Sequence, residues 1–178
     1  SSLEFLDLSQ NNLEVFGSCL IAKILEKNTT LKGLNLFKNN IDVGGARALR
    51  DLLKVNSTLE FLDVGHNRIR HKGLEALAEG IMEGVPSKLK KLAVRMNFIS
   101  DVGFHKFFHR VIFSDKNVIE DLFINENNLT QYKALELQEK LNKCNQALFV
   151  DKFEKLHYVK EEKTKRTVWF GPVSEYTK

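Results

Sequence analysis

Cysteine is scarce in this sequence, and this limits the kinds of fold that the chain can build. The 178 residues contain two cysteines, Cys19 and Cys144, which lie far apart in stretches with a helix-like pattern. Two such residues do not make a disulfide framework or a zinc cluster. A chain of this kind is typical of a reducing compartment, so we predict a cytoplasmic protein.

Long apolar runs, linkers and one-sided charge are lacking as well. No apolar stretch approaches the ~20 residues that span a bilayer, so no membrane segment is expected. The chain has only two prolines and no low-complexity tract, which favours one domain with a small appendage. There are 27 basic and 23 acidic residues, a net charge of +4, without a long block of one sign. A nucleic-acid partner is therefore not predicted.

Motifs of catalysis are missing too. The sequence contains no G-x-S-x-G, no phosphate-binding loop and no Cys/His pair at a plausible spacing. His105 and His109 are four residues apart, as two metal ligands on one helix face would be, but they form no H-E-x-x-H and no third ligand is evident. We predict exposed helix histidines, and no metal, cofactor or enzymatic activity.

What the sequence does contain is an internal repeat. The pattern L-x-x-L-x-L-x-x-N-x-L, with other apolar residues replacing some leucines, occurs five times and begins at Leu3, Leu31, Leu59, Leu89 and Ile119. Apolar residues at every second position predict a short strand in each copy. The amide that follows lies between apolar positions and needs hydrogen-bond partners when buried. We predict a structural ladder of Asn11, Asn39, Asn67, Asn97 and Asn127.

The second half of each copy predicts a helix. A glycine follows the asparagine by six residues in the first four copies, and large apolar residues follow at intervals of four, as on one helical face. These glycines are Gly17, Gly45, Gly73 and Gly103, and Lys133 takes the place in the fifth copy. A glycine there permits close packing of the helix against the preceding unit.

This arrangement resembles the leucine-rich repeats, specifically the ribonuclease-inhibitor-like subclass found in NOD-like receptors, RanGAP and tropomodulin. The resemblance covers residues 3 to about 145, and it implies that residues 1–145 form five repeats of an α/β leucine-rich-repeat solenoid, a segment of a curved horseshoe. Parallel strands would line its concave face and helices its convex face. One unit cannot bury its apolar faces alone, so stacked units share one continuous core.

The two ends depart from the repeat. The chain enters the first copy in mid-repeat, so we expect further repeats or a cap before residue 1, or a partner chain over that end. After Cys144 the pattern fails, and we expect residues 146–178 to form a C-terminal cap. This cap would contain a short strand within 147–151 and a hairpin built from 155–159 and 167–170. The alternatives are a disordered tail or a separate docking motif.

The variable strand positions point to a protein-binding surface. Residues between the strand leucines would face the concave side, and they include four phenylalanines amid charges. The alternative is that these rings pack sideways on each other. The predicted partner-binding residues are Phe5, Asp7, Asn35, Phe37, Phe61, Asp63, Lys91, Arg95, Asp121 and Phe123. We expect Phe61 and Arg95 to contribute most, since both are central and of hot-spot type. A basic loop adds His66, Arg68 and Arg70 as loop contacts, or is simply a solvated edge.

The sequence therefore predicts a protein–protein interaction module or scaffold whose partner it does not identify. A second hypothesis is a regulator of a small GTPase similar to RanGAP, acting through the loop residues Gln10, Lys38, His66, Met96 and Glu126. A third is a structural subunit of a cytoskeletal or axonemal assembly.

Overall fold

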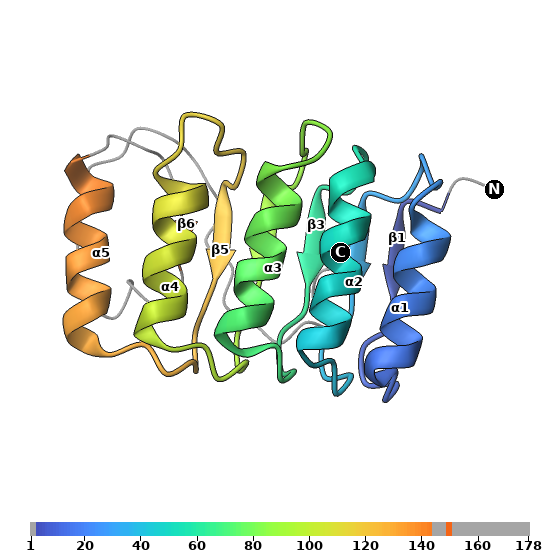
Figure 1. The fold of residues 1–178 in the computed structure, drawn as a ribbon, viewed down its shortest axis with the longest axis horizontal. Helices are drawn as coiled ribbons and strands as arrows, with labels where there is room; N and C mark the ends of the chain where they lie inside the picture. Colours follow the sequence, from blue (N-terminus) through green and yellow to red (C-terminus); the bar gives the residue numbers. More distant parts are fainter. Residues whose placement is uncertain (1–2, 144–148, 151–178) are drawn as a thin grey trace.

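A computed structural model describes residues 3–143 and 149–150, which form one layer of strands covered on one side by one layer of helices (Figure 1). The strands are β1 (Phe5–Asp7), β2 (Gly33–Asn35), β3 (Phe61–Asp63), β4 (Lys91–Ala93), β5 (Asp121–Phe123) and β6 (Phe149–Val150). The helices are α1 (Glu14–Leu25), α2 (Val43–Val55), α3 (Arg70–Met82), α4 (Asp101–Phe107), the π-helical turn η1 (Phe108–Ile112) and α5 (Gln131–Lys143).

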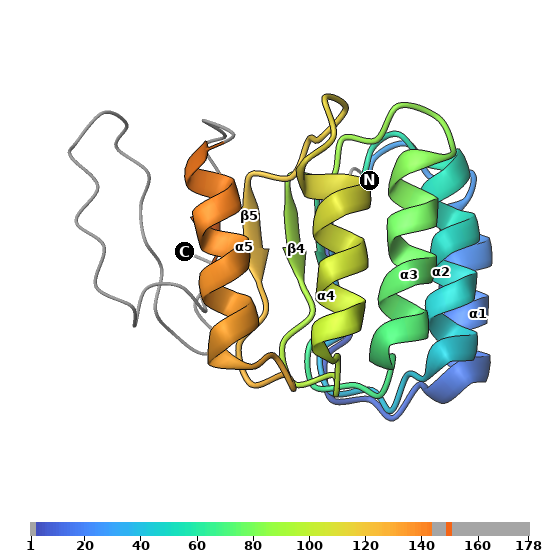
Figure 2. The same cartoon turned by 60° about the vertical axis from the view of Figure 1, so that its left-hand side comes forward.

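The sheet follows the order of the chain from β1 to β6, and every neighbouring pair is parallel. Each of the first four strand-to-strand connections carries a helix, and Figure 2 shows the helices standing side by side next to the sheet. The expected α/β leucine-rich-repeat solenoid is confirmed. β6 lies within the stretch 147–151 for which a sixth strand was expected. The predicted hairpin lies outside the described residues.

The core runs without interruption between the two layers. The strand leucines Leu34, Leu62, Leu92 and Leu122 have no solvent exposure. A cluster of phenylalanines on α4 and η1 fills the helix side of the fourth unit, and all three rings are buried: Phe104, Phe107 and Phe108. Within the described residues no helix is long and apolar enough to cross a membrane.

The helix glycines explain how closely the units stack. A Cβ on Gly73 of α3 would lie 3.1 Å from the Cβ of Ala46 on α2. A Cβ on Gly103 of α4 would lie 2.9 Å from the Cβ of His71 on α3. The predicted close packing of the helix start against the preceding unit is therefore confirmed for α3 and α4, since a larger residue would push the units apart. A Cβ on Gly17 of α1 would instead meet Leu13 of its own unit.

The asparagine ladder joins the loops that follow the strands. The carbonyl oxygen of Asn67 accepts hydrogen bonds from the backbone N–H groups of Asn39 and Ile41, both at 2.9 Å. Its amide nitrogen donates to the backbone carbonyls of Leu36 at 3.0 Å and Val64 at 2.9 Å. Asn39, Asn97 and Asn127 form corresponding bonds between units. The ladder is confirmed, and it fixes the path of every loop at the carboxyl ends of the strands.

Candidate protein-binding surface

The concave face is the sheet face that points away from the helices. Strand register aligns its side chains in rows that cross all the units. One row consists of Phe5, Gly33, Phe61, Lys91 and Asp121, and the next of Asp7, Asn35, Asp63, Ala93 and Phe123. Eight of the ten predicted binding residues lie in these two rows. The other two, Arg95 and Phe37, lie at equivalent positions two residues after the ends of β4 and β2.

The aromatic residues of this face lie sideways over small neighbours. The rings of Phe5 and Phe61 stack across Gly33, with centroids 5.8 Å apart and planes at 21°. Phe37 leans over Gly65 and against His66, whose ring centroid lies 5.6 Å away. Because glycine leaves the space above the strand empty, a ring from the preceding unit fills it. This sideways packing is the alternative that the sequence left open.

The prediction that all of these concave-face residues are accessible to a partner is therefore partly wrong. Phe61 is 8% exposed and Phe123 is 7% exposed, and Asn35 and Asp63 have no exposed surface. Phe61 and Phe123 do not belong to the hydrophobic core between sheet and helices, so neighbouring side chains on the concave face bury them. Phe5, Phe37, Asp7, Lys91, Arg95 and Asp121 remain partly or fully exposed.

The polar row has a structural role in its first three units. Asp7, Asn35 and Asp63 each accept a hydrogen bond from the backbone N–H two residues further on, at 2.8, 3.0 and 2.7 Å. Burial raises the pKa of the Asp63 carboxyl above its ordinary value, although the N–H of Gly65 and the nearby Arg95 oppose this shift. The amide nitrogen of Asn35 is buried and finds no hydrogen-bond partner among the described residues.

Arg95 is the central cation of the concave face. Its guanidinium lies 5.6 Å from the ring centroid of Phe123, within cation–π range, and one terminal nitrogen is 3.5 Å from the carboxylate of Asp63. Its Nε is buried and makes no hydrogen bond in the described part of the chain. Lys91 pairs with Asp121 at 3.0 Å. The face therefore carries a positive centre whose donors are only partly used.

The loop residues lie at the carboxyl ends of the strands, the lower edge in Figure 1. His66, Arg68 and Arg70 are all exposed, as expected of loop contacts. The five residues of the GTPase-regulator hypothesis share one feature, a left-handed backbone with φ between 51° and 61°: Gln10, Lys38, His66, Met96 and Glu126. The ladder imposes this conformation on each loop, and their role in function stays a prediction.

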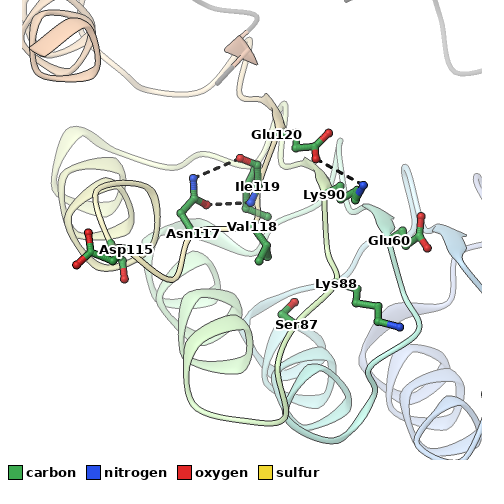
Figure 3. A pocket seen from close by; sticks show the side chains of 10 residues that line it. Glu60, Ser87, Lys88, Lys90, Asp115, Asn117, Val118, Ile119 and Glu120 are labelled. Carbon is green, nitrogen blue, oxygen red and sulfur yellow. Dashed lines mark hydrogen bonds and ion pairs between the residues drawn. The ribbon is translucent and has the colours of Figure 1, made fainter. Parts of the chain in front are cut away.

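Two further pockets flank the sheet. One opens at the amino ends of β4 and β5 with a volume of about 450 Å³, and Figure 3 shows its lining. Two of its charged residues pair with each other, Lys90 with Glu120 at 3.5 Å, and Asn117 bonds both backbone groups of Ile119. The other, about 390 Å³, lies at the loop edge between His66, Arg68, Met96 and Phe98.

Phe98 is a residue that the sequence reasoning missed. It is 60% exposed and follows a ladder asparagine, at a position where the other units have Asn12, Asn40, Arg68 and Asn128. An aromatic residue in a place usually given to asparagine was a signal available in the sequence.

The histidine pair lies on consecutive helical segments, His105 on α4 and His109 on η1. The rings of His105 and His109 lie 4.5 Å apart, and within the described residues no group of three potential ligands comes together. His109 is exposed as predicted, whereas His105 is half-buried. Burial, with the neighbouring His105 and Lys140, lowers the pKa of His109.

Comparisons with known proteins agree with this architecture. Family models described as leucine-rich repeats match residues 2–24, 27–49 and 55–78. Among solved structures 55 chains match, and one of these is the actin-binding site 2 of leiomodin-1. It superposes with a TM-score of 0.58 at 17% sequence identity, over 80% of this chain and 88% of that one. At this identity the likeness concerns the fold. No curated protein sequence gives a significant match.

Proposed function

The chain is a leucine-rich-repeat protein, and from this premise we propose that it is a protein-interaction module that binds a partner protein through its concave face. A stack of short parallel strands cannot flex much within one unit, because each loop is held by the asparagine ladder. Such a rigid surface presents its side chains in a fixed arrangement and so loses little conformational freedom on binding.

The observation that carries this proposal is the state of Arg95. Its guanidinium lies 5.6 Å from the ring centroid of Phe123 and 3.5 Å from the carboxylate of Asp63, and the side chain is 21% exposed, so its accessible N–H groups can meet a carboxylate from outside. Arginine in a preorganised, partly buried position is a frequent hot spot of protein interfaces. Elsewhere on the same face, the Phe5–Phe61 stack adds apolar surface to a groove of about 270 Å³ that also includes Lys91.

The test compares charge changes on the two faces. Lys91→Glu alters the concave face, and Lys106→Glu on α4 is its control, because both lysines pair with a carboxylate, at 3.0 and 3.3 Å, and their side chains are 51% and 57% exposed. Arg95→Lys keeps a cation beside Asp63 but removes the planar fork that binds carboxylates. The tagged chain and its variants are used to capture partners from cell extract, and the dissociation constant is then measured with the purified partner.

We expect Lys91→Glu and Arg95→Lys together to weaken binding by at least about 2 kcal/mol, roughly thirtyfold, and Lys106→Glu to leave it unchanged. Circular dichroism must show the same fold in all variants. Binding that survives the double concave change, or that is lost in Lys106→Glu alone, would contradict the proposal.

Actin is the first defined partner to examine. The actin-binding site 2 of leiomodin-1 has the same fold, and the assembly-subunit hypothesis calls for a cytoskeletal partner. Cosedimentation with actin filaments and a pyrene-actin assembly assay would detect this. Sedimentation that depends on Arg95 and Lys91 would support actin as the partner, and no sedimentation would direct attention to other proteins.

A further inference from the structure

The pocket at the loop edge combines strain, exposure and unused charge in one place. It is lined by residues from the loops that follow β2, β3, β4 and β5, and its volume is about 390 Å³. The lining consists of Asn40, His66, Asn67, Arg68, Met96, Phe98 and Glu126. It lies at the carboxyl ends of the strands and so adjoins the concave face without being part of it.

The first observation is the backbone of Phe98. Its φ is 57°, in the left-handed region that asparagine tolerates and that an aromatic residue adopts only with strain. The equivalent residues in the first two units, Asn12 and Asn40, have φ of 50° and 55°. The N–H groups of Asn97 and Ile99 on either side are both held by the carbonyl oxygen of Asn127. The ladder thus forces Phe98 into this conformation.

The second observation is that the ring is not needed inside the protein. The side chain of Phe98 is 60% exposed, and no ring contact to it is found among the described residues. Met96 precedes the ladder asparagine in the same loop, also with a left-handed backbone. A strained position with an exposed aromatic ring costs stability without an internal gain, and such a residue is typical of a binding site.

The third observation is charge. Arg68 and His66 line the pocket, and Arg70 follows at the start of α3. Neither arginine forms an ion pair with any described residue, although many other cations of the chain do. Glu126 is the acidic residue of the lining. Free guanidinium groups beside apolar surface are complementary to carboxylates that flank an apolar side chain.

We propose that this pocket binds an acidic segment of a protein partner, with one apolar side chain against Phe98 and Met96 and flanking carboxylates on Arg68 and Arg70. This goes beyond the concave-face interaction and defines a second contact whose chemistry is different. A partner that uses both surfaces would be held at the sheet face and at its lower edge, which raises its apparent affinity through multivalency.

The probe is a capped six-residue peptide with a central leucine flanked by glutamates, titrated into the isotopically labelled full chain and followed by amide NMR shifts. One control peptide has serine for the leucine, and another has lysines for the glutamates. We expect shifts at Arg68, Met96 and Phe98 with a dissociation constant on the order of 1 mM, the weak range of short ligands. Both control peptides are expected to bind at least about fivefold more weakly.

Two variants separate a binding role from a structural one. Phe98→Asn installs the residue that the first units have, so we expect its melting temperature to rise while peptide affinity falls at least about fivefold. Val102→Ser is the matched control, because Val102 is 61% exposed, lies nearby on α4 and does not line the pocket. Arg68→Gln is expected to weaken binding of the peptide and to reduce its salt dependence.

Several results would overturn this second contact. They are the absence of peptide shifts up to the solubility limit, equal binding of the lysine peptide, unchanged affinity in Phe98→Asn, or a lower melting temperature of that variant. The outcome is independent of the concave face, because Arg95→Lys should leave peptide binding at the edge unchanged.

Discussion

Phe5 and Gly33 are matched across the first two strands. A Cβ on Gly33 would lie 2.3 Å from the Cδ2 of the Phe5 ring, so the ring occupies the space that any other residue would need. The two residues are register partners in the parallel pair of β1 and β2. The stack of Phe5 on Phe61 depends on this gap, because both rings meet above the glycine. One absent side chain thus shapes the concave surface.

The first prediction concerns this pair. Gly33→Ala should displace the Phe5 ring and lower the free energy of unfolding by about 1–3 kcal/mol, as overpacking does. Chemical denaturation measures this change. In a Phe5→Ala background the same substitution meets no ring, so the penalty should largely disappear. If Gly33→Ala lowered the free energy of unfolding equally with Phe5 and with Ala at position 5, contact with the Phe5 ring would not be the reason for a glycine at position 33.

The second prediction concerns the ladder. Asn67→Ala leaves the backbone N–H groups of Asn39 and Ile41 and two or more carbonyls without their partner. Each buried unsatisfied group costs about 1–3 kcal/mol, so we expect a loss of at least about 3 kcal/mol in the free energy of unfolding. Asn11→Ala is the comparison, since Asn11 is exposed and water can replace its bonds. If both variants lost a similar free energy of unfolding, burial of the asparagine would not explain how much the ladder stabilises the fold.

The third prediction concerns the pH dependence of stability. The pKa of Asp63 is raised in the folded state, chiefly by burial, from an ordinary value of 3.8. A folded state that holds its proton more tightly than the unfolded chain is favoured at low pH. This advantage is lost as pH rises from the ordinary value through the raised one.

Asp63→Asn isolates this effect, because Asn35 shows that an asparagine fits the equivalent position with the same backbone bond. The free energy of unfolding of the variant minus that of the native chain should therefore increase as the pH rises above the ordinary pKa of 3.8. Denaturation at several pH values measures it. The contributions of the other carboxylates are the same in both proteins and cancel in the difference. A difference that does not change with pH would contradict a raised pKa of Asp63.

The fourth prediction concerns a partly exposed ion-pair cluster on α5. Glu136 lies between Lys133 and Lys140, and hydrogen bonds to these two lysines lower its pKa to about 2. A lowered folded-state pKa gives stability above the ordinary value of 4.5 that is lost as pH falls towards 2. NMR titration of the carboxyl group should show the low pKa, and Lys133→Gln with Lys140→Gln should return it towards 4.5. An unchanged pKa in the double variant would exclude the lysines as its cause.

The difference between expected and observed exposure has a physical reason. Alternation along a strand tells which side chains point away from the core: Leu62 points into it, so Phe61 and Asp63 on either side point away. Alternation does not tell which side chains cover Phe61 and Asp63 on the concave face, because those side chains belong to other units. Phe61 is covered by Phe5, which comes 56 positions earlier, and this requires a glycine at position 33.

The amino-acid sequence by itself determined the repeat, the strand and helix of each unit, the buried core and the ladder of asparagines. These follow from periodicity and from the need of a buried amide for partners, and both are local properties that recur along the chain. Only the tertiary structure decided which concave residues remain accessible, that Arg95 meets Asp63 and Phe123, and that Phe98 is strained beside Arg68. These relationships join side chains from different units, so they depend on the register and spacing of the stacked strands.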